Sequence, residues 1–160
     1  PHAQAIGVAD ERIAPLMAGV LARRCDRGFV FHGTDGLDEL TTTGPSDVWV
    51  LGGGRCEHAV LDPAELGLAP AAREDLVGGD PEHNAGVVRE VVSGATGPVR
   101  DIVTLNAAAA MLAFDGPDFD EPVADQLRAR LEQARRVIDD GRAAALLDRW
   151  ISSTREHARE

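Results

Sequence analysis

Lysine and tyrosine are absent from this 160-residue sequence, and aromatic residues make up only 4% of it. All 16 basic side chains are therefore arginines, and a hydrophobic core has to be built mainly from aliphatic residues. The sequence is also poor in positive charge, because 27 acidic residues leave a formal net charge of −11. Nucleic acids and anionic membranes are bound through basic surfaces, so we expect neither of them as the main partner.

Long hydrophobic runs and targeting signals are absent as well. The longest apolar stretch, residues 107–114, is too short to span a bilayer, and no basic segment followed by an apolar one marks a signal peptide. Cys25 and Cys56 stand alone, without a CxxC motif or a nearby histidine pair, which favours two free thiols in a reducing compartment. These features predict a cytoplasmic protein. The first residue is proline rather than methionine, which is compatible with a partial chain.

The first sixty or so residues carry the strand patterns of an α/β domain. Residues 3–8 and 28–33 have the pattern of buried strands, and the helical spacing between them becomes regular at Ala14. A strand, a helix and a strand in this order form a βαβ unit, which implies parallel pairing. Two short strands, residues 47–51 and 56–61, flank a Gly-Gly-Gly turn and are expected to form a hairpin.

The remaining residues are mostly helical. Pro81 begins a segment with a shared apolar face, and residues 99–114 are apolar on nearly every side, which predicts a central helix. Apolar residues from Val123 to Ile138 stripe a half-buried helix, and a last helix follows Gly141. We therefore predict the α/β fold class, with a mostly parallel sheet and flanking helices. The strands are few for a free-standing sheet, so we expect an incomplete portion of a larger α/β domain.

The clearest candidate for chemistry is the polar segment after the strand at residues 28–33. Asp38 and Glu39 stand side by side, no lysine or arginine lies between Arg27 and Arg55 to pair with them, and three threonines follow. Open α/β sheets bind ligands beyond the carboxyl ends of their strands. Mg²⁺ prefers carboxylate and hydroxyl oxygens, and it takes only one or two carboxylates while sharing itself with substrate phosphates. Two interpretations remain open from the residues alone, namely a Mg²⁺ site and a solvated acidic turn.

Three glycine-rich segments do not predict a phosphate-binding loop. Residues 52–54 lie between two strands, and residues 94–97 lie between two helices. Residues 78–79 do precede a helix, but Asp80 and Glu82 occupy its start, where they cap the helix and repel an anion. None of the three matches GxGxxG or a Walker loop.

Two polar residues in apolar segments are interpreted as structural. His32 ends the second strand beside the acidic segment, where a hydrogen-bonded structural role is favoured over contact with a ligand. Asn106 lies inside an apolar helix and must satisfy its amide, so we expect it to tie that helix to a neighbouring backbone. Trp49 and Trp150 are assigned to core or interface packing. No Ser/His/Asp or Cys/His arrangement can be argued, so no catalytic side chain is assigned.

Motifs spread in order over almost the whole chain resemble the anthranilate phosphoribosyltransferases. The resemblance is carried by residues 30–33, 36–44, 61–67, 78–80, 84–85, 97–103, 105–109 and 138–143. The related pyrimidine nucleoside phosphorylases share the fold, but the Gly-Leu-Asp-Glu sequence at residues 36–39 is similar to the anthranilate branch.

This resemblance implies a reaction for the complete enzyme. The amine of anthranilate attacks C1 of phosphoribosyl pyrophosphate and displaces pyrophosphate, in an early step of tryptophan biosynthesis. Asp38 and Glu39 would hold Mg²⁺ against the pyrophosphate, because the departing polyanion requires charge stabilisation. The resemblance also implies a homodimer in the full-length enzyme.

The resemblance covers only the family's C-terminal half, so residues 1–160 are expected to form the C-terminal part of its α/β catalytic domain. The family's N-terminal helical domain, its glycine-rich pyrophosphate loop and its Lys-His-Gly-Asn-Arg segment have no counterpart here. We therefore expect little or no activity from this chain alone. Two alternatives stay open: a non-catalytic remnant or interaction module of the same fold, and a relative of the pyrimidine nucleoside phosphorylases.

Overall fold

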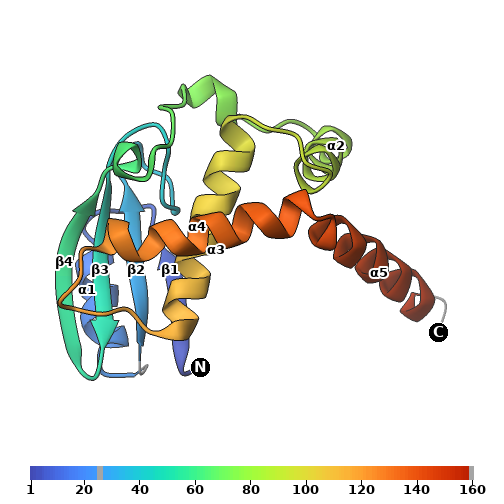
Figure 1. Cartoon of the computed structure of the whole chain (residues 1–160). Helices are drawn as coiled ribbons and strands as arrows, with labels where there is room; N and C mark the ends of the chain where they lie inside the picture. Colours follow the sequence, from blue (N-terminus) through green and yellow to red (C-terminus); the bar gives the residue numbers. More distant parts are fainter. Residues whose placement is uncertain (25–26, 159–160) are drawn as a thin grey trace.

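The computed structural model describes residues 1–24 and 27–158, which form a four-stranded sheet with helices packed on both of its faces (Figure 1). In chain order the elements are β1 (Ala3–Gly7), α1 (Ala14–Leu21), β2 (Arg27–Gly33), β3 (Ser46–Gly52), β4 (Arg55–Leu61), the short 3₁₀ helices η1 (Pro63–Leu66) and η2 (Arg73–Leu76), α2 (Pro81–Val92), α3 (Pro98–Asp115), α4 (Val123–Asp139) and α5 (Arg142–His157). The α/β fold class is confirmed, as is the regular start of α1 at Ala14.

The sheet is mixed, which corrects the expectation of a mostly parallel sheet. Its strand order is β1-β2-β3-β4, and β1 runs parallel to β2, with Ile6 opposite Val30. The pairs β2–β3 and β3–β4 are both antiparallel. The predicted βαβ unit therefore supplies one parallel pair. Residues 34–45 contain no helix that could carry the chain back across the sheet, so β3 returns in the opposite direction.

The predicted hairpin is formed by β3 and β4. Gly53 and Gly54 make its turn with φ angles of 56° and 83°, which are left-handed values that glycine adopts without steric cost. Two such residues in succession match the twist of the flanking strands. Gly52 and Arg55 close the turn as the last cross-strand pair.

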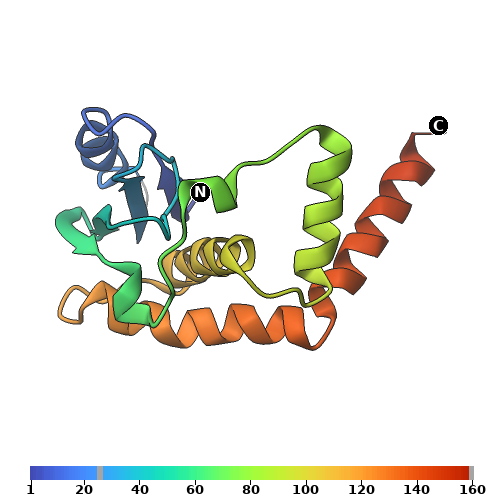
Figure 2. The same ribbon diagram turned by 90° about the horizontal axis from the view of Figure 1, so that it is seen from above.

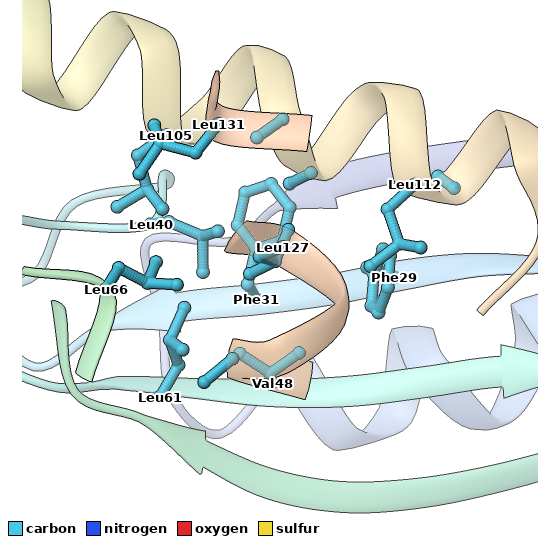
Figure 3. Packing of buried hydrophobic residues seen from close by; sticks show 14 of the residues in the cluster. Phe29, Phe31, Leu40, Val48, Leu61, Leu66, Leu105, Leu112, Leu127 and Leu131 are labelled. Atoms are coloured by element: carbon cyan, nitrogen blue, oxygen red, sulfur yellow. The ribbon is translucent and has the colours of Figure 1, made fainter. Parts of the chain in front are cut away.

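The main hydrophobic core lies between one face of the sheet and the helices α3 and α4 (Figure 3). Strand residues meet helix residues there, among them Phe29, Phe31, Val48, Leu61, Leu105, Leu112, Leu127 and Leu131. Leu105 and Ala108 of α3 are completely buried, which confirms α3 as the central helix that the sequence predicts. The other face of the sheet is covered by α1, whose Ala14 and Ala18 pack with Val30 and Leu51.

The helices α2 and α5 lie away from the sheet, at the end of α4 that leads into α5 (Figure 2). On the apolar face predicted for α2, Val91 is buried but Val88 is 49% exposed. Trp150 of α5 is 70% exposed, so it is not a core residue of this chain. The sequence pattern alone predicts that Val88 and Trp150 pack against other residues. In the structure, the arrangement of α2 and α5 leaves part of their apolar surface uncovered.

Three further expectations concern single features. Trp49 is partly buried and packs against the α1 side of the sheet. Cys56 is an exposed free thiol, whereas Cys25 lies outside the described residues. No helix among residues 1–24 and 27–158 has the length and apolar character needed to cross a membrane.

Candidate functional site

The acidic loop, defined here as residues 34–43, starts where β2 ends and passes over the end of β1. A Cβ atom at Gly7 would lie only 1.6 Å from the carbonyl oxygen of Asp38, so glycine allows the loop backbone to touch this strand. The ends of the two strands are joined by His32, whose Nδ1 lies 2.7 Å from the carbonyl oxygen of Val8. This hydrogen bond agrees with the structural role predicted for His32. The loop therefore lies at the carboxyl edge of the parallel pair, where α/β sheets bind ligands.

Asp35 organises the acidic loop from inside. Its Oδ2 accepts hydrogen bonds from the hydroxyls of Thr41 and Thr43, each at 2.6 Å, and its Oδ1 accepts one from the backbone N–H of Leu37 at 3.1 Å. Partial burial acts to raise the pKa of Asp35, but these hydrogen bonds together outweigh it and hold the pKa below its usual range. Asp35 is therefore ionised at neutral pH and binds both sides of the segment that carries Asp38 and Glu39.

Asn106 of α3 attaches the loop to the core. Its Oδ1 accepts from the backbone N–H of Leu40 at 3.0 Å, and its Nδ2 donates to the carbonyl oxygens of Leu40 and Ile102 at 2.9 and 3.0 Å. The prediction that Asn106 ties its helix to a neighbouring backbone is confirmed. The side chain of Leu40 is itself buried in the main core, so the position directly after Glu39 is fixed by both packing and hydrogen bonds.

Asp38 and Glu39 stand between these anchors, and both are exposed. Neither forms an ion pair with any residue in the described part of the chain. The pKa of Glu39 is raised, first because its carboxyl group is partly desolvated and second because Asp38 is a like charge beside it. A divalent cation at this position would remove the repulsion between the two carboxylates.

The donor set fits a hard cation that keeps most of its coordination positions open. No group of three or more His, Cys, Asp or Glu side chains that could hold a metal ion occurs among the described residues. Mg²⁺ does not need such a group, because it is commonly held by one or two carboxylates together with waters and substrate phosphates. The threonine hydroxyls, which the sequence offered as further ligands, have other surroundings: Thr41 and Thr43 donate to Asp35, and Thr42 is completely buried.

In the glycine-rich turn before α2, the helix cap predicted for Asp80 is formed. The Asp80 carboxylate caps the helix by accepting from the backbone N–H of His83 at 2.8 Å. Asn84 bonds both backbone groups of Gly79, with its Oδ1 accepting from the N–H at 2.8 Å and its Nδ2 donating to the carbonyl at 3.0 Å. The Gly79 N–H, which a phosphate loop would offer to an anion, is thus used by a side chain of this protein.

Sequence reasoning missed Asp35 and its two threonine partners. A signal was present, because aspartate often bonds the backbone N–H two residues further on, and Asp35 is followed by Gly36 and then Leu37. The contacts to Thr41 and Thr43 carry no comparable local signal, since they depend on how the rest of the loop returns.

The sequence of this chain is similar to a known protein family and to several curated proteins. The model of the glycosyl transferase family, a/b domain, matches residues 1–144. The chain is 54% identical over 154 residues to an anthranilate phosphoribosyltransferase from Arthrobacter sp. (strain FB24), a match that covers 96% of this chain and 44% of that protein. It is 51% identical to the anthranilate phosphoribosyltransferase of Acidothermus cellulolyticus, covering 96% and 43%. The chain thus spans less than half the length of these relatives.

Solved structures agree with the sequence comparison. The anthranilate phosphoribosyltransferase of Thermus thermophilus superposes with a TM-score of 0.76 at 36% identity, covering 91% of this chain and 41% of that one. The enzyme from Saccharomyces cerevisiae in complex with PRPP and Mg superposes with a TM-score of 0.80 at 24% identity, covering 95% and 42%, which shows the shared fold. The resemblance to the anthranilate phosphoribosyltransferases is confirmed. Because the family model matches 144 residues of the 160, this chain belongs to the glycosyl transferase family through that family's α/β domain.

Proposed function

We propose that this chain is the metal-binding, C-terminal part of an anthranilate phosphoribosyltransferase, in which Asp38 and Glu39 hold Mg²⁺ against the pyrophosphate of phosphoribosyl pyrophosphate. The observation that carries the proposal is the pair itself: two adjacent, exposed carboxylates lie at the carboxyl edge of β1 and β2, on a loop fixed from both sides. The similarity to relatives of that name supports the choice of substrates. A solved yeast relative in complex with PRPP and Mg supports the choice of metal.

The residues of this chain would serve the reaction by placement. Bound Mg²⁺ would supply positive charge against the developing pyrophosphate, which is the main requirement when a polyanion leaves. Asp38 and Glu39 provide two anionic oxygen ligands and leave the remaining positions to phosphate oxygens and water. Asp35 and Asn106 keep the loop backbone in one position, so that the pair is preorganised rather than ordered by the ligand.

The cation also reconciles the charge of the protein with that of its substrate. A chain with a formal net charge of −11 repels a polyanionic substrate at long range. Asp38 and Glu39 would hold a divalent cation that offsets this repulsion at short range, because a bound ion is the largest local charge. Because the chain spans less than half of its relatives, we expect residues 1–160 alone to bind the metal and diphosphate but to have little or no turnover.

Isothermal titration calorimetry tests the proposed site. Mg²⁺ is titrated into the chain with inorganic pyrophosphate present, and the heats of the same titration without protein are subtracted. We expect a binding heat for the wild type, loss of that heat for Asp38→Ala, and retention for the control Glu90→Ala, which removes an exposed carboxylate on α2 instead. Equal heats for the wild type and Asp38→Ala would refute the site and favour a non-catalytic remnant of the same fold.

A further inference from the structure

We propose that Asp35 is a positioning residue of the metal site: its carboxylate does not bind the cation but holds the segment from Leu37 to Thr41 in the conformation that presents Asp38 and Glu39. The inference rests on the proposed function, since it assigns a role within the same site. It concerns a residue that the sequence did not single out and that lies outside the acidic pair.

The hydrogen bonds of Asp35 enclose the metal-binding pair along the chain. Leu37, which donates its N–H to Oδ1, comes directly before Asp38, and Thr41, which donates its hydroxyl to Oδ2, follows Glu39 after one intervening residue. Thr43 donates a second hydroxyl to the same Oδ2. One side chain thus fixes the start and the end of a short segment, and only an ionised carboxylate can accept all three hydrogen bonds without competing protons.

Close packing around Asp35 leaves little room for its side chain or the neighbouring backbone to move. A Cβ atom at Gly33 would lie 2.6 Å from the Asp35 Oδ1 and 3.2 Å from the carbonyl oxygen of Glu39, so the glycine allows both groups to approach β2. The hydroxyls of Thr41 and Thr43 lie 3.1 Å apart, and the backbone N–H of Thr43 donates to the Thr41 hydroxyl at the same distance. Asp35 is therefore the centre of a small polar network whose members flank the exposed pair along the chain.

The network also separates the roles of three neighbouring acids. The oxygens of Asp35 accept hydrogen bonds from two hydroxyls and one amide, which disperse its charge locally. Asp38 and Glu39 are both exposed and have no ion-pair partner among the described residues. Residues that orient metal ligands without touching the metal commonly change metal affinity by about tenfold to a hundredfold when they are removed.

Two neighbouring threonines, Thr42 and Thr43, provide a matched set of variants. Thr43→Val removes a donor to Asp35 with almost no change in shape, and Thr43→Ser restores that donor. Thr42→Val is the control, because Thr42 is completely buried and its hydroxyl has no hydrogen-bond partner among the described residues. Asp35→Ala removes the acceptor itself, and Asp38→Ala removes a ligand of the proposed metal site.

Each full 160-residue variant is titrated with Mn²⁺ alone. Binding is monitored in NMR spectra by the paramagnetic broadening of the amide signals of residues 37–40. All titrations are made well below the melting temperature of the least stable variant. We expect Thr43→Val and Asp35→Ala to raise the dissociation constant about tenfold or more, while Thr43→Ser and Thr42→Val stay within about twofold of the wild type. Amide hydrogen exchange of the same residues should accelerate in the two weakened variants only.

The outcomes separate the two proposals. If the wild type binds Mn²⁺ at residues 37–40, Asp38→Ala abolishes binding, and Thr43→Val and Asp35→Ala leave it unchanged, the positioning role is wrong while the metal site stands. If Thr42→Val weakens binding as much as Thr43→Val, the effect comes from packing and the positioning role is again wrong. If the wild type does not bind Mn²⁺ there, the proposed function fails and the inference fails with it.

Discussion

Glu39 is the member of the acidic pair whose carboxyl group is partly desolvated. Partial desolvation and the charge of Asp38 raise its pKa, so its protonated form persists to a higher pH than that of an ordinary glutamate. Folding without a bound metal therefore disfavours the ionised form of Glu39 relative to the unfolded chain. The resulting contribution to stability is present below the unfolded pKa of a glutamate and is lost as the pH rises through the raised pKa of Glu39. A bound cation reverses this preference because it favours the ionised form.

The pH dependence of metal binding follows from the raised pKa of Glu39. Affinity for Mg²⁺ should decline on acidification at a higher pH than two ordinary carboxylates would give, because the proton competes with the metal for Glu39. In Glu39→Gln the affinity should be lower at neutral pH, and the decline on acidification should be smaller, because the ligand with the raised pKa is gone. Calorimetric titrations from mildly acidic to neutral pH measure both effects. Identical pH profiles for wild type and Glu39→Gln would show that Glu39 is not a ligand.

At the scale of the elements, the acidic loop depends on contacts with three neighbours. The loop backbone packs against β1 at Gly7 and is hydrogen-bonded to Asn106 of α3. On β3, the Ser46 hydroxyl accepts a hydrogen bond from the backbone N–H of Thr41 at 3.0 Å. The backbone of the acidic loop is thus attached to two strands and a helix. Its position is therefore sensitive to changes in elements that do not carry the acidic residues.

Two glycine substitutions test this dependence in opposite directions. Gly7→Ala places a methyl group within the space of the Asp38 carbonyl, so the loop or β1 must move, and we expect a loss of about 1–3 kcal/mol of unfolding free energy together with weaker metal binding. Gly19→Ala lies in α1, where nothing is within 4 Å of the added carbon, and it should gain about 0.5–1 kcal/mol. Urea denaturation gives both values. Equal stability of the two variants would contradict the close contact between β1 and the loop.

At the scale of the whole molecule, local sequence patterns predicted where helices and strands lie better than they predicted how these elements pack against one another. The start of α1 at Ala14, the β3–β4 hairpin at Gly53 and Gly54, and the central position of α3 all follow from periodicity and turn residues. The antiparallel return of β3 could not be predicted in this way, because its direction is set by the absence of a helix from residues 34–45 rather than by any motif. The same applies to the exposure of Val88 and Trp150, which depends on which helices meet.

Some residues of the candidate site could likewise be identified from local sequence, whereas others required the tertiary structure. Asp38, Glu39 and the binding role of Asn106 were accessible from residue type and position, because adjacent carboxylates and a polar residue in an apolar helix are conspicuous in sequence. The role of Asp35 required the folded loop, since its hydroxyl donors lie six and eight residues further along the chain. The exposure of both acidic side chains, which makes them available to a cation, is likewise a property of the tertiary structure.

The proposed metal site is tested most sharply by an anomalous difference map from crystals of this chain soaked in Mn²⁺ and pyrophosphate. We predict a peak within coordinating distance of the carboxylate oxygens of Asp38 and Glu39, with the acidic loop in the conformation described above. A map with no peak at the loop, and with both carboxylates directed into bulk solvent, would contradict the assignment of the metal to this pair.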